Sequence, residues 1–179
     1  MTMAESLGKF EWLRKEGAPK MLVELLSLYG TKETLGSGNN PEILSWAKEL
    51  GLKDYTNDAI AWCGLTMAIV AKRADKIVPK DPLWALNWRN FGAPVSEAML
   101  GDVLVFTRNG GGHVTMYIGE NDDYYFCLGG NQSDMINITK IPKSRTHWVR
   151  RPVYSIAQPD NVRKVRINDS GAPTSSKES

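Results

Sequence analysis

The sequence predicts one α+β domain in which helices come first and an antiparallel sheet follows. Three observations lead to this class. The chain has 179 residues, of which 42% are hydrophobic and 23% charged, a size and composition that suit a single globular domain. Apolar residues recur at helical spacing in the first half, whereas the second half consists of β-branched and aromatic runs separated by Gly, Asn and Asp. Because the helices precede the strands instead of alternating with them, the class is α+β.

The helical half is divided by capping residues, prolines and glycines. Asn40 followed by Pro41, and Asp81 followed by Pro82, are typical helix starts. The third helix has Asp58 as its candidate N-cap and is apolar nearly all round, which predicts a central, buried helix. The predicted helices cover residues 19–30, 39–53, 58–75 and 81–92.

The second half predicts a sheet of about five strands, because its apolar runs alternate with turn-forming clusters. The second and third strands are separated by the short sequence ENDD, so we expect them to form a hairpin. The predicted strands are residues 101–108, 112–120, 123–131, 135–142 and 146–154.

The predicted domain spans residues 1–157, with residues 1–18 as an N-terminal helical extension. Residues 158–179 are polar and predicted to be disordered, because they have little apolar surface to bury. The N-terminus has no apolar segment after a basic start, and the longest apolar run, residues 59–71, is too short to span a bilayer. We therefore expect a protein made in the host cytoplasm without a signal peptide and without stable membrane insertion.

The overall charge is mildly basic, with a formal net charge of +2 and a pI near 8.5. This balance gives no reason to expect a nucleic-acid partner, and it is compatible with an anionic polymer such as a bacterial cell wall.

Cys63 has two interpretations. It lies in the apolar run DAIAWCGLTMAIVAKRAD, and free cysteine is among the most buried residue types, so it can simply fill the core. It also follows the start of a predicted helix, whose positive potential lowers the pKa of a thiol and favours the nucleophilic thiolate, and Gly64 leaves space beside it. Cys127 lies in the middle of a predicted strand and is interpreted as a core residue.

A cysteine nucleophile needs a base, and the base needs an orienting group. Of the two histidines, His113 follows the sequence NGGG, in which Gly112 allows a substrate to approach the backbone. His147 lies between basic residues and beside a tryptophan, and it is interpreted as a surface or packing residue. His113 is therefore the candidate base.

The orienting group is expected from the end of the strand 123–131, which the hairpin brings to the same open end as His113. An amide oxygen or a carboxylate there would accept a hydrogen bond from the imidazole and fix its tautomer. Asn131 is preferred because the strand pairing brings it nearest, and Gln132 and Asp134 are alternatives.

The order of these motifs resembles a known group of enzymes. Cys63 at a helix start is followed by GDVLVF, GHVTMYIGE and LGGNQ, and this order is similar to that of the papain-like cell-wall cysteine peptidases. These are the CHAP (cysteine, histidine-dependent amidohydrolase/peptidase) and NlpC-type families, and the chain resembles in particular a phage-encoded, endolysin-like subgroup. The resemblance covers about residues 19–152. It implies a papain-like fold with the nucleophile on a central helix that packs on the sheet.

The resemblance also implies the roles of individual residues. Cys63 would be the nucleophile, His113 the base and Asn131 the third polar residue, with no metal and no cofactor. Asp102 would be a structural residue at the entry of a strand, and Thr115 departs from the family pattern of glycine or alanine at that position. The expected substrate-contacting residues are Trp62, which would line the cleft, Gly64, Gly112 and Gln132.

The expected activity is hydrolysis of an amide bond in the stem peptide of peptidoglycan, an endopeptidase reaction through a thioester, in a phage lysis enzyme. Alternatives are a phage tail-associated wall-opening enzyme, an injected antibacterial amidase effector and a non-enzymatic wall-binding or virion structural module. The expected partners are peptidoglycan and either a phage pore-forming protein or virion tail proteins, with action in the periplasm, outside the cell or from the virion. A zinc-binding domain that uses both cysteines and both histidines is disfavoured, because these residues lack the close spacing of zinc motifs.

Overall fold

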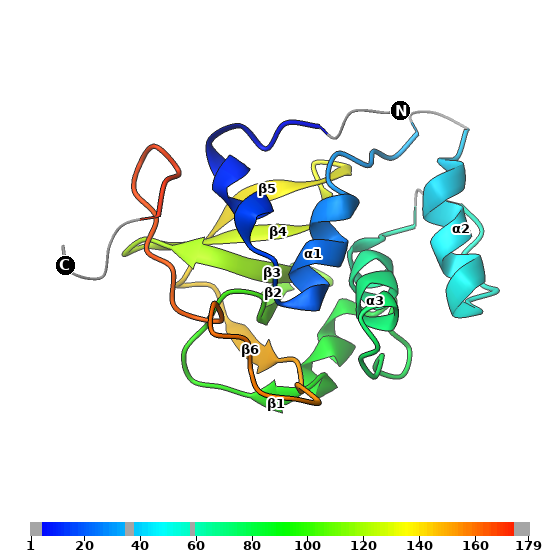
Figure 1. The fold of residues 1–179 in the computed structure, drawn as a ribbon. Coiled ribbons are helices and arrows are strands. Elements are labelled where there is room, and N and C mark those ends of the chain that lie inside the picture. The colour runs from blue at the N-terminus through cyan, green and yellow to red at the C-terminus, as the bar shows by residue number, and fades with distance from the viewer. Residues whose placement is uncertain (1–4, 35–37, 58–59, 174–179) are drawn as a thin grey trace.

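Figure 1 shows the fold of the chain in a computed structural model, which describes residues 5–34, 38–57 and 60–173. Within these residues an open antiparallel sheet of six strands has the order β1-β6-β2-β3-β4-β5. The predicted α+β class is confirmed, and the short strand β1 adds to the strands that the sequence predicts. The strands are β1 (Ala93–Pro94), β2 (Val103–Arg108), β3 (Gly111–Glu120), β4 (Tyr124–Gln132), β5 (Met135–Pro142) and β6 (His147–Arg151).

The helices are held together by α3, which packs against α1 and α2 and against the strands β3 and β4 (Figure 1). The residues of α3 from Cys63 to Ala71 are all buried, so the prediction of a central, buried helix is confirmed. The helices in the described part of the chain are the 3-10 helices η1 (Gly8–Lys15) and η2 (Ala85–Asn90) and the α-helices α1 (Lys20–Ser27), α2 (Pro41–Leu50) and α3 (Cys63–Arg73).

The start of α3 differs from the prediction. The helix begins at Cys63 with Trp62 at the N-cap position, and no side chain caps it. The predicted cap, Asp58, lies outside the described residues. The start of α2 agrees with the prediction, because the side chain of Asn40 accepts a hydrogen bond from the backbone N–H of Glu42. The last predicted helix is the short 3-10 helix η2.

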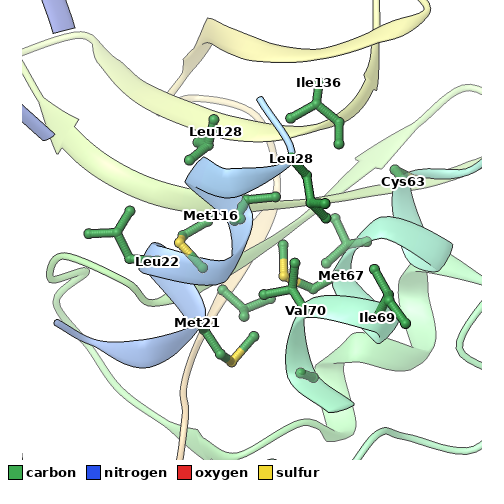
Figure 2. Close-up of a cluster of buried hydrophobic side chains, with 14 of the residues drawn as sticks. Met21, Leu22, Leu28, Cys63, Met67, Ile69, Val70, Met116, Leu128 and Ile136 are labelled. Carbon is green, nitrogen blue, oxygen red and sulfur yellow. The ribbon is translucent and has the colours of Figure 1, made fainter. Parts of the chain in front are cut away.

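The two faces of the sheet bury different side chains, as strand alternation requires. From β3, Val114, Met116 and Ile118 join the core under the helices, whereas Tyr117 faces the other side. Cys127 belongs to the core on that other side and is fully buried, which confirms its interpretation as a core residue. Figure 2 shows the helix-side core, which includes Met21 and Leu22 from α1, Met67 and Val70 from α3, and Met116 and Leu128 from the sheet.

The prediction of a disordered C-terminal tail is wrong for residues 158–173. Val162, Val165 and Ile167 are buried. The backbone of Glu120 at the end of β3 donates to the Val165 carbonyl at 2.8 Å and accepts from the Ile167 N–H at 2.9 Å. These apolar residues are separated by polar ones, so the composition of the segment does not predict their burial. Residues 174–179 lie outside the described part of the chain.

Asp102, which precedes β2, is fully buried and has a structural role, as the sequence predicts. Its carboxylate accepts hydrogen bonds from Arg151 Nε at 2.9 Å and Arg151 Nη2 at 2.8 Å, and from the backbone N–H of Met99 at 2.8 Å. This pair ties the start of β2 to the end of β6 and fixes the edge of the sheet next to β1.

Candidate functional site

Cys63 is a free, buried cysteine at the first position of α3, and 4% of its surface is exposed (Figure 2). Burial raises the pKa of the thiol, and hydrogen bonding with the backbone of Val114 and the positive charge of Arg108 act in the opposite direction. Because the pKa is raised on balance, the thiol is protonated at neutral pH. The helix start alone therefore does not produce the thiolate that the sequence interpretation assumes.

Trp62 does not line a cleft as the resemblance implies. Its side chain is fully buried, lies 6.4 Å from the ring of Trp46 and donates from Nε1 to the Glu33 carboxylate at 3.2 Å. The Trp62 carbonyl accepts a hydrogen bond from Thr66 Oγ1 at 2.8 Å. Trp62 thus anchors the start of α3 between α2 and the segment before it, and it presents no surface to a substrate.

Glycines bring the neighbouring elements close to the start of α3. A Cβ atom on Gly130 of β4 would collide with the side chain of Thr66 on α3. The expected substrate space at Gly64 and Gly112 is already filled, because a Cβ on Gly64 would meet the Pro82 carbonyl and one on Gly112 would meet the side chain of Leu86. The segment from Pro82 to η2 therefore covers both glycines, and their lack of a side chain serves packing of the chain on itself.

His113 is buried in β3 and holds its two ring nitrogens in different environments. Its Nε2 lies 3.0 Å from Gln132 Oε1, and an amide oxygen can only accept, so Nε2 carries the proton. Its Nδ1 is buried and has no hydrogen-bond partner among the described residues. Burial, the largest effect, lowers the pKa of His113, so the ring is neutral with an unoccupied lone pair on Nδ1.

Gln132 is held in this orientation by its own contacts. Its Oε1 also accepts from Thr115 Oγ1 at 3.0 Å. Its Nε2 donates to the Asn137 carbonyl at 2.9 Å, to Asn137 Oδ1 at 3.1 Å and to the Cys127 carbonyl at 3.2 Å. Because the NH2 group faces acceptors only, the amide cannot be turned around without losing all three bonds.

The preferred orienting residue, Asn131, does not make this contact, and the alternative Gln132 does. The register of β3 with β4 places Met116 opposite Leu128, and its simple continuation would put Asn131 opposite His113. The pairing of β4 with β5 is irregular between Gly129 and Gln132, and Asn131 has a φ of 56°. Such a bulge redirects the side chains that follow it, and here it turns Gln132 to the imidazole.

The remaining candidates lie apart from this contact. Asp134 is exposed in the turn between β4 and β5 and has a φ of 61°. His147 packs against the rings of Phe106 and Tyr125, and its Nδ1 lies 2.7 Å from the Arg145 carbonyl, which confirms its interpretation as a packing residue.

Cys63 approaches β3 directly beside His113. Its thiol is within hydrogen-bonding range of the backbone of Val114, the residue that follows His113 in the strand. Within the described residues no hydrogen bond joins the Cys63 sulfur to Nδ1 of His113. The thiol thus lies at the backbone next to His113, whose side chain is on the face of the sheet that carries Phe106, and no hydrogen bond joins the two groups.

Among the described residues, no group of three or more His, Cys, Asp or Glu side chains is placed to hold a metal ion, so the zinc interpretation has no ligand cluster in this part of the chain. None of its helices combines the length and the apolar character needed to cross a bilayer. Neither a protein-family model nor a curated protein matches this sequence.

Proposed function

We propose that the protein is a papain-like cysteine hydrolase that cleaves an amide bond in the stem peptide of peptidoglycan. Cys63 is the nucleophile, His113 the general base and Gln132 the residue that positions the imidazole. One observation carries the proposal. Nδ1 of His113 is buried and unpartnered while Nε2–H is held by an amide, and the buried free thiol of Cys63 lies at the backbone of the adjacent Val114. A buried polar atom without a partner is rare and needs an explanation. A role of Nδ1 as the proton acceptor in catalysis provides one.

The charge state of the pair determines the first step. Burial raises the pKa of Cys63 and lowers the pKa of His113, so the resting pair is an uncharged thiol and an uncharged imidazole. When the substrate is bound, the thiol proton passes to Nδ1 as the sulfur attacks the amide carbonyl. Hydrogen bonds of this kind are often long or poorly aligned in free enzymes and tighten only in the reacting complex.

The later steps return the proton and complete the hydrolysis. The carbonyl carbon becomes tetrahedral, its C–N bond breaks, and the proton on Nδ1 passes to the leaving amine, which leaves a thioester on Cys63. His113 then takes a proton from water, the resulting hydroxide attacks the thioester, and the thiol is released with the proton from Nδ1. The backbone N–H of Cys63 is one of the first N–H groups of α3, which lack helical partners and stabilise the oxyanion.

The substrate class and the biological role come from the resemblance of the motif order. The families that the motif order resembles act on cell-wall stem peptides, and the mildly basic charge of this chain suits an anionic wall. We propose that the protein is a phage lysis enzyme. The tail-associated enzyme and the injected effector would use the same chemistry, whereas a wall-binding or structural module would need none.

The experiment follows turbidity loss and released fragments from purified peptidoglycan. Cys63→Ala is compared with Cys127→Ala, a matched control because both residues are buried, free cysteines in the same domain. We expect activity to disappear in the first variant and to persist in the second, with folding of each checked by circular dichroism. Mass spectrometry of the fragments identifies the bond. Equal activity of a folded Cys63→Ala variant would contradict the proposal.

A further inference from the structure

A hollow with a volume of about 510 Å³ lies at the turn between β2 and β3. Its lining is polar and carries two arginines. Arg108 ends β2, Asn109 follows it in the turn, and Arg145 lies in the loop between β5 and β6. The lining residues are Thr107, Arg108, Asn109 and Arg145.

The strand register places this hollow at the end of the sheet that carries His113. Phe106 of β2 pairs with His113 of β3, and Arg108 pairs with Gly111. Residues two apart in a strand share a face, and directly paired residues of an antiparallel ladder share one too, so Arg108, Phe106 and His113 lie on the same face. The guanidinium of Arg145 lies over the Phe106 ring, 6.0 Å from its centroid.

Neither arginine is neutralised within the described part of the protein. Other arginines there pair with carboxylates, as Arg73 does with Glu49 and Arg151 with Asp102, but Arg108 and Arg145 have no Asp or Glu within ion-pair distance. Their charges reach the candidate catalytic pair, since both act together with burial to lower the pKa of His113. The hollow is therefore a positively charged recess on the face of the sheet that carries His113.

We propose that Arg108 and Arg145 form a subsite for a carboxylate of the substrate peptide, on the face of the sheet that carries His113. This inference rests on the proposed peptidase function. Planar guanidinium groups bind carboxylates through paired hydrogen bonds, and Asn109 adds a neutral donor beside them. Two strand positions separate Arg108 from Phe106, the residue that pairs with His113, so Arg108 lies roughly 7 Å along the sheet from the candidate base.

The test uses a soluble stem peptide in three forms: with all carboxylates free, with the C-terminal carboxylate amidated and with the side-chain carboxylate amidated. Hydrolysis is measured for the wild type, Arg108→Gln, Arg145→Gln and the control Arg73→Gln. Arg73 pairs with Glu49 at the other end of α3 and changes the net charge equally. We expect each subsite variant to raise KM for the free peptide about tenfold or more, and the control to change KM less than about twofold.

Amidation of the recognised carboxylate should raise the wild-type KM similarly and abolish the difference between wild type and subsite variants. The two amidated peptides identify which carboxylate is bound. KM values that rise equally for free and amidated peptides, or do not rise, would overturn the subsite.

A second arm separates this inference from the proposed function. Calorimetric titration of Cys63→Ala, with and without the Arg108→Gln and Arg145→Gln changes, measures binding of the same three peptides without hydrolysis. A preference for one free carboxylate that disappears without the arginines supports the subsite even if the wild type cleaves nothing. Equal binding of all three forms, or no binding, overturns the subsite.

Discussion

The contact between His113 and Gln132 predicts that replacing Gln132 impairs the candidate site. The sequence alone would assign the orienting role to Asn131 instead. Gln132→Ala removes the acceptor for the His113 Nε2–H and for the Thr115 hydroxyl, both 3.0 Å from Gln132 Oε1. Asn131→Gly is the matched control. It removes the neighbouring amide and keeps a backbone that already has a φ of 56°, which glycine adopts without strain.

The magnitude follows from the contacts that are lost. The Thr115 hydroxyl can rotate to another acceptor, but the buried Nε2–H cannot, and an unsatisfied buried donor together with the truncated side chain costs about 2–4 kcal/mol of unfolding free energy. This is less than the roughly 5–15 kcal/mol that stabilise a typical domain, so the variant should fold. We expect Asn131→Gly to change the unfolding free energy by less than about 1 kcal/mol.

Activity should separate the two variants more clearly than stability. Without Gln132 the imidazole loses its preferred tautomer, and kcat should fall by about 10²-fold with KM little changed, because base catalysis contributes about 10²–10⁴-fold to such reactions. The hydrogen bond that His113 donates to Gln132 also raises the pKa of His113, so the acid limb of the pH profile should move to lower pH in Gln132→Ala.

The assay combines denaturant unfolding with peptidoglycan hydrolysis across pH. A purely structural role for Gln132 would lower the yield of folded protein without moving the acid limb. Asn131→Gly with the larger loss of kcat, and Gln132→Ala near wild type, would refute the assignment and return the orienting role to Asn131.

Two further predictions concern charge. Because burial lowers the pKa of His113 and raises that of Cys63, kcat/KM should stay level from below pH about 6.5 to above pH about 8.5. Alkylation of Cys63 by iodoacetamide should accelerate only above pH about 8.5. A maximum alkylation rate already at pH 6 would contradict the uncharged pair. Arg151→Leu leaves the buried Asp102 carboxylate unpaired and should cost about 3–5 kcal/mol in denaturant unfolding, most of it recovered by adding Asp102→Asn. A loss below about 1 kcal/mol would show that the pair is not needed.

The sign of the pH effect on stability follows from the same groups. The unfolded chain binds a proton on His113 at a higher pH than the folded chain does, because the folded pKa is lowered. Its contribution to stability is therefore complete above about pH 6.5 and is lost as the pH falls through the folded pKa.

Most of the fold could be predicted because its signals are local. The capped start of α2 and the alternating runs of β2 to β6 depend on residues that are neighbours in sequence, and the hairpin of β3 and β4 depends on a short turn. The docked segment 158–173 was missed because its buried residues, Val162, Val165 and Ile167, contact parts of the chain that are distant in sequence.

The candidate site was predicted less completely, since its details depend on tertiary contacts. Helical spacing does not reveal that α3 begins at Cys63, nor that Trp62 is buried against Trp46. The rule of strand pairing led to Asn131, and a bulge is an exception that the rule cannot anticipate. Arg108 and Arg145 carried a weak signal, the position of Arg108 directly before the glycine run that precedes His113.

The contact of Gln132 with His113 and the presence of threonine at position 115, where the resembled families have glycine or alanine, have one physical explanation. A hydroxyl at position 115 donates to Gln132 Oε1 and so helps to fix the amide that holds His113. Room for that hydroxyl comes from Gly129, where a Cβ atom would lie 2.5 Å from Thr115 Oγ1 and 3.2 Å from Gln132 Oε1. Glycine or alanine at position 115 would leave the amide with fewer partners. The position that departs from the pattern is therefore part of the support for the imidazole, and these side chains should tolerate joint replacement better than single replacement.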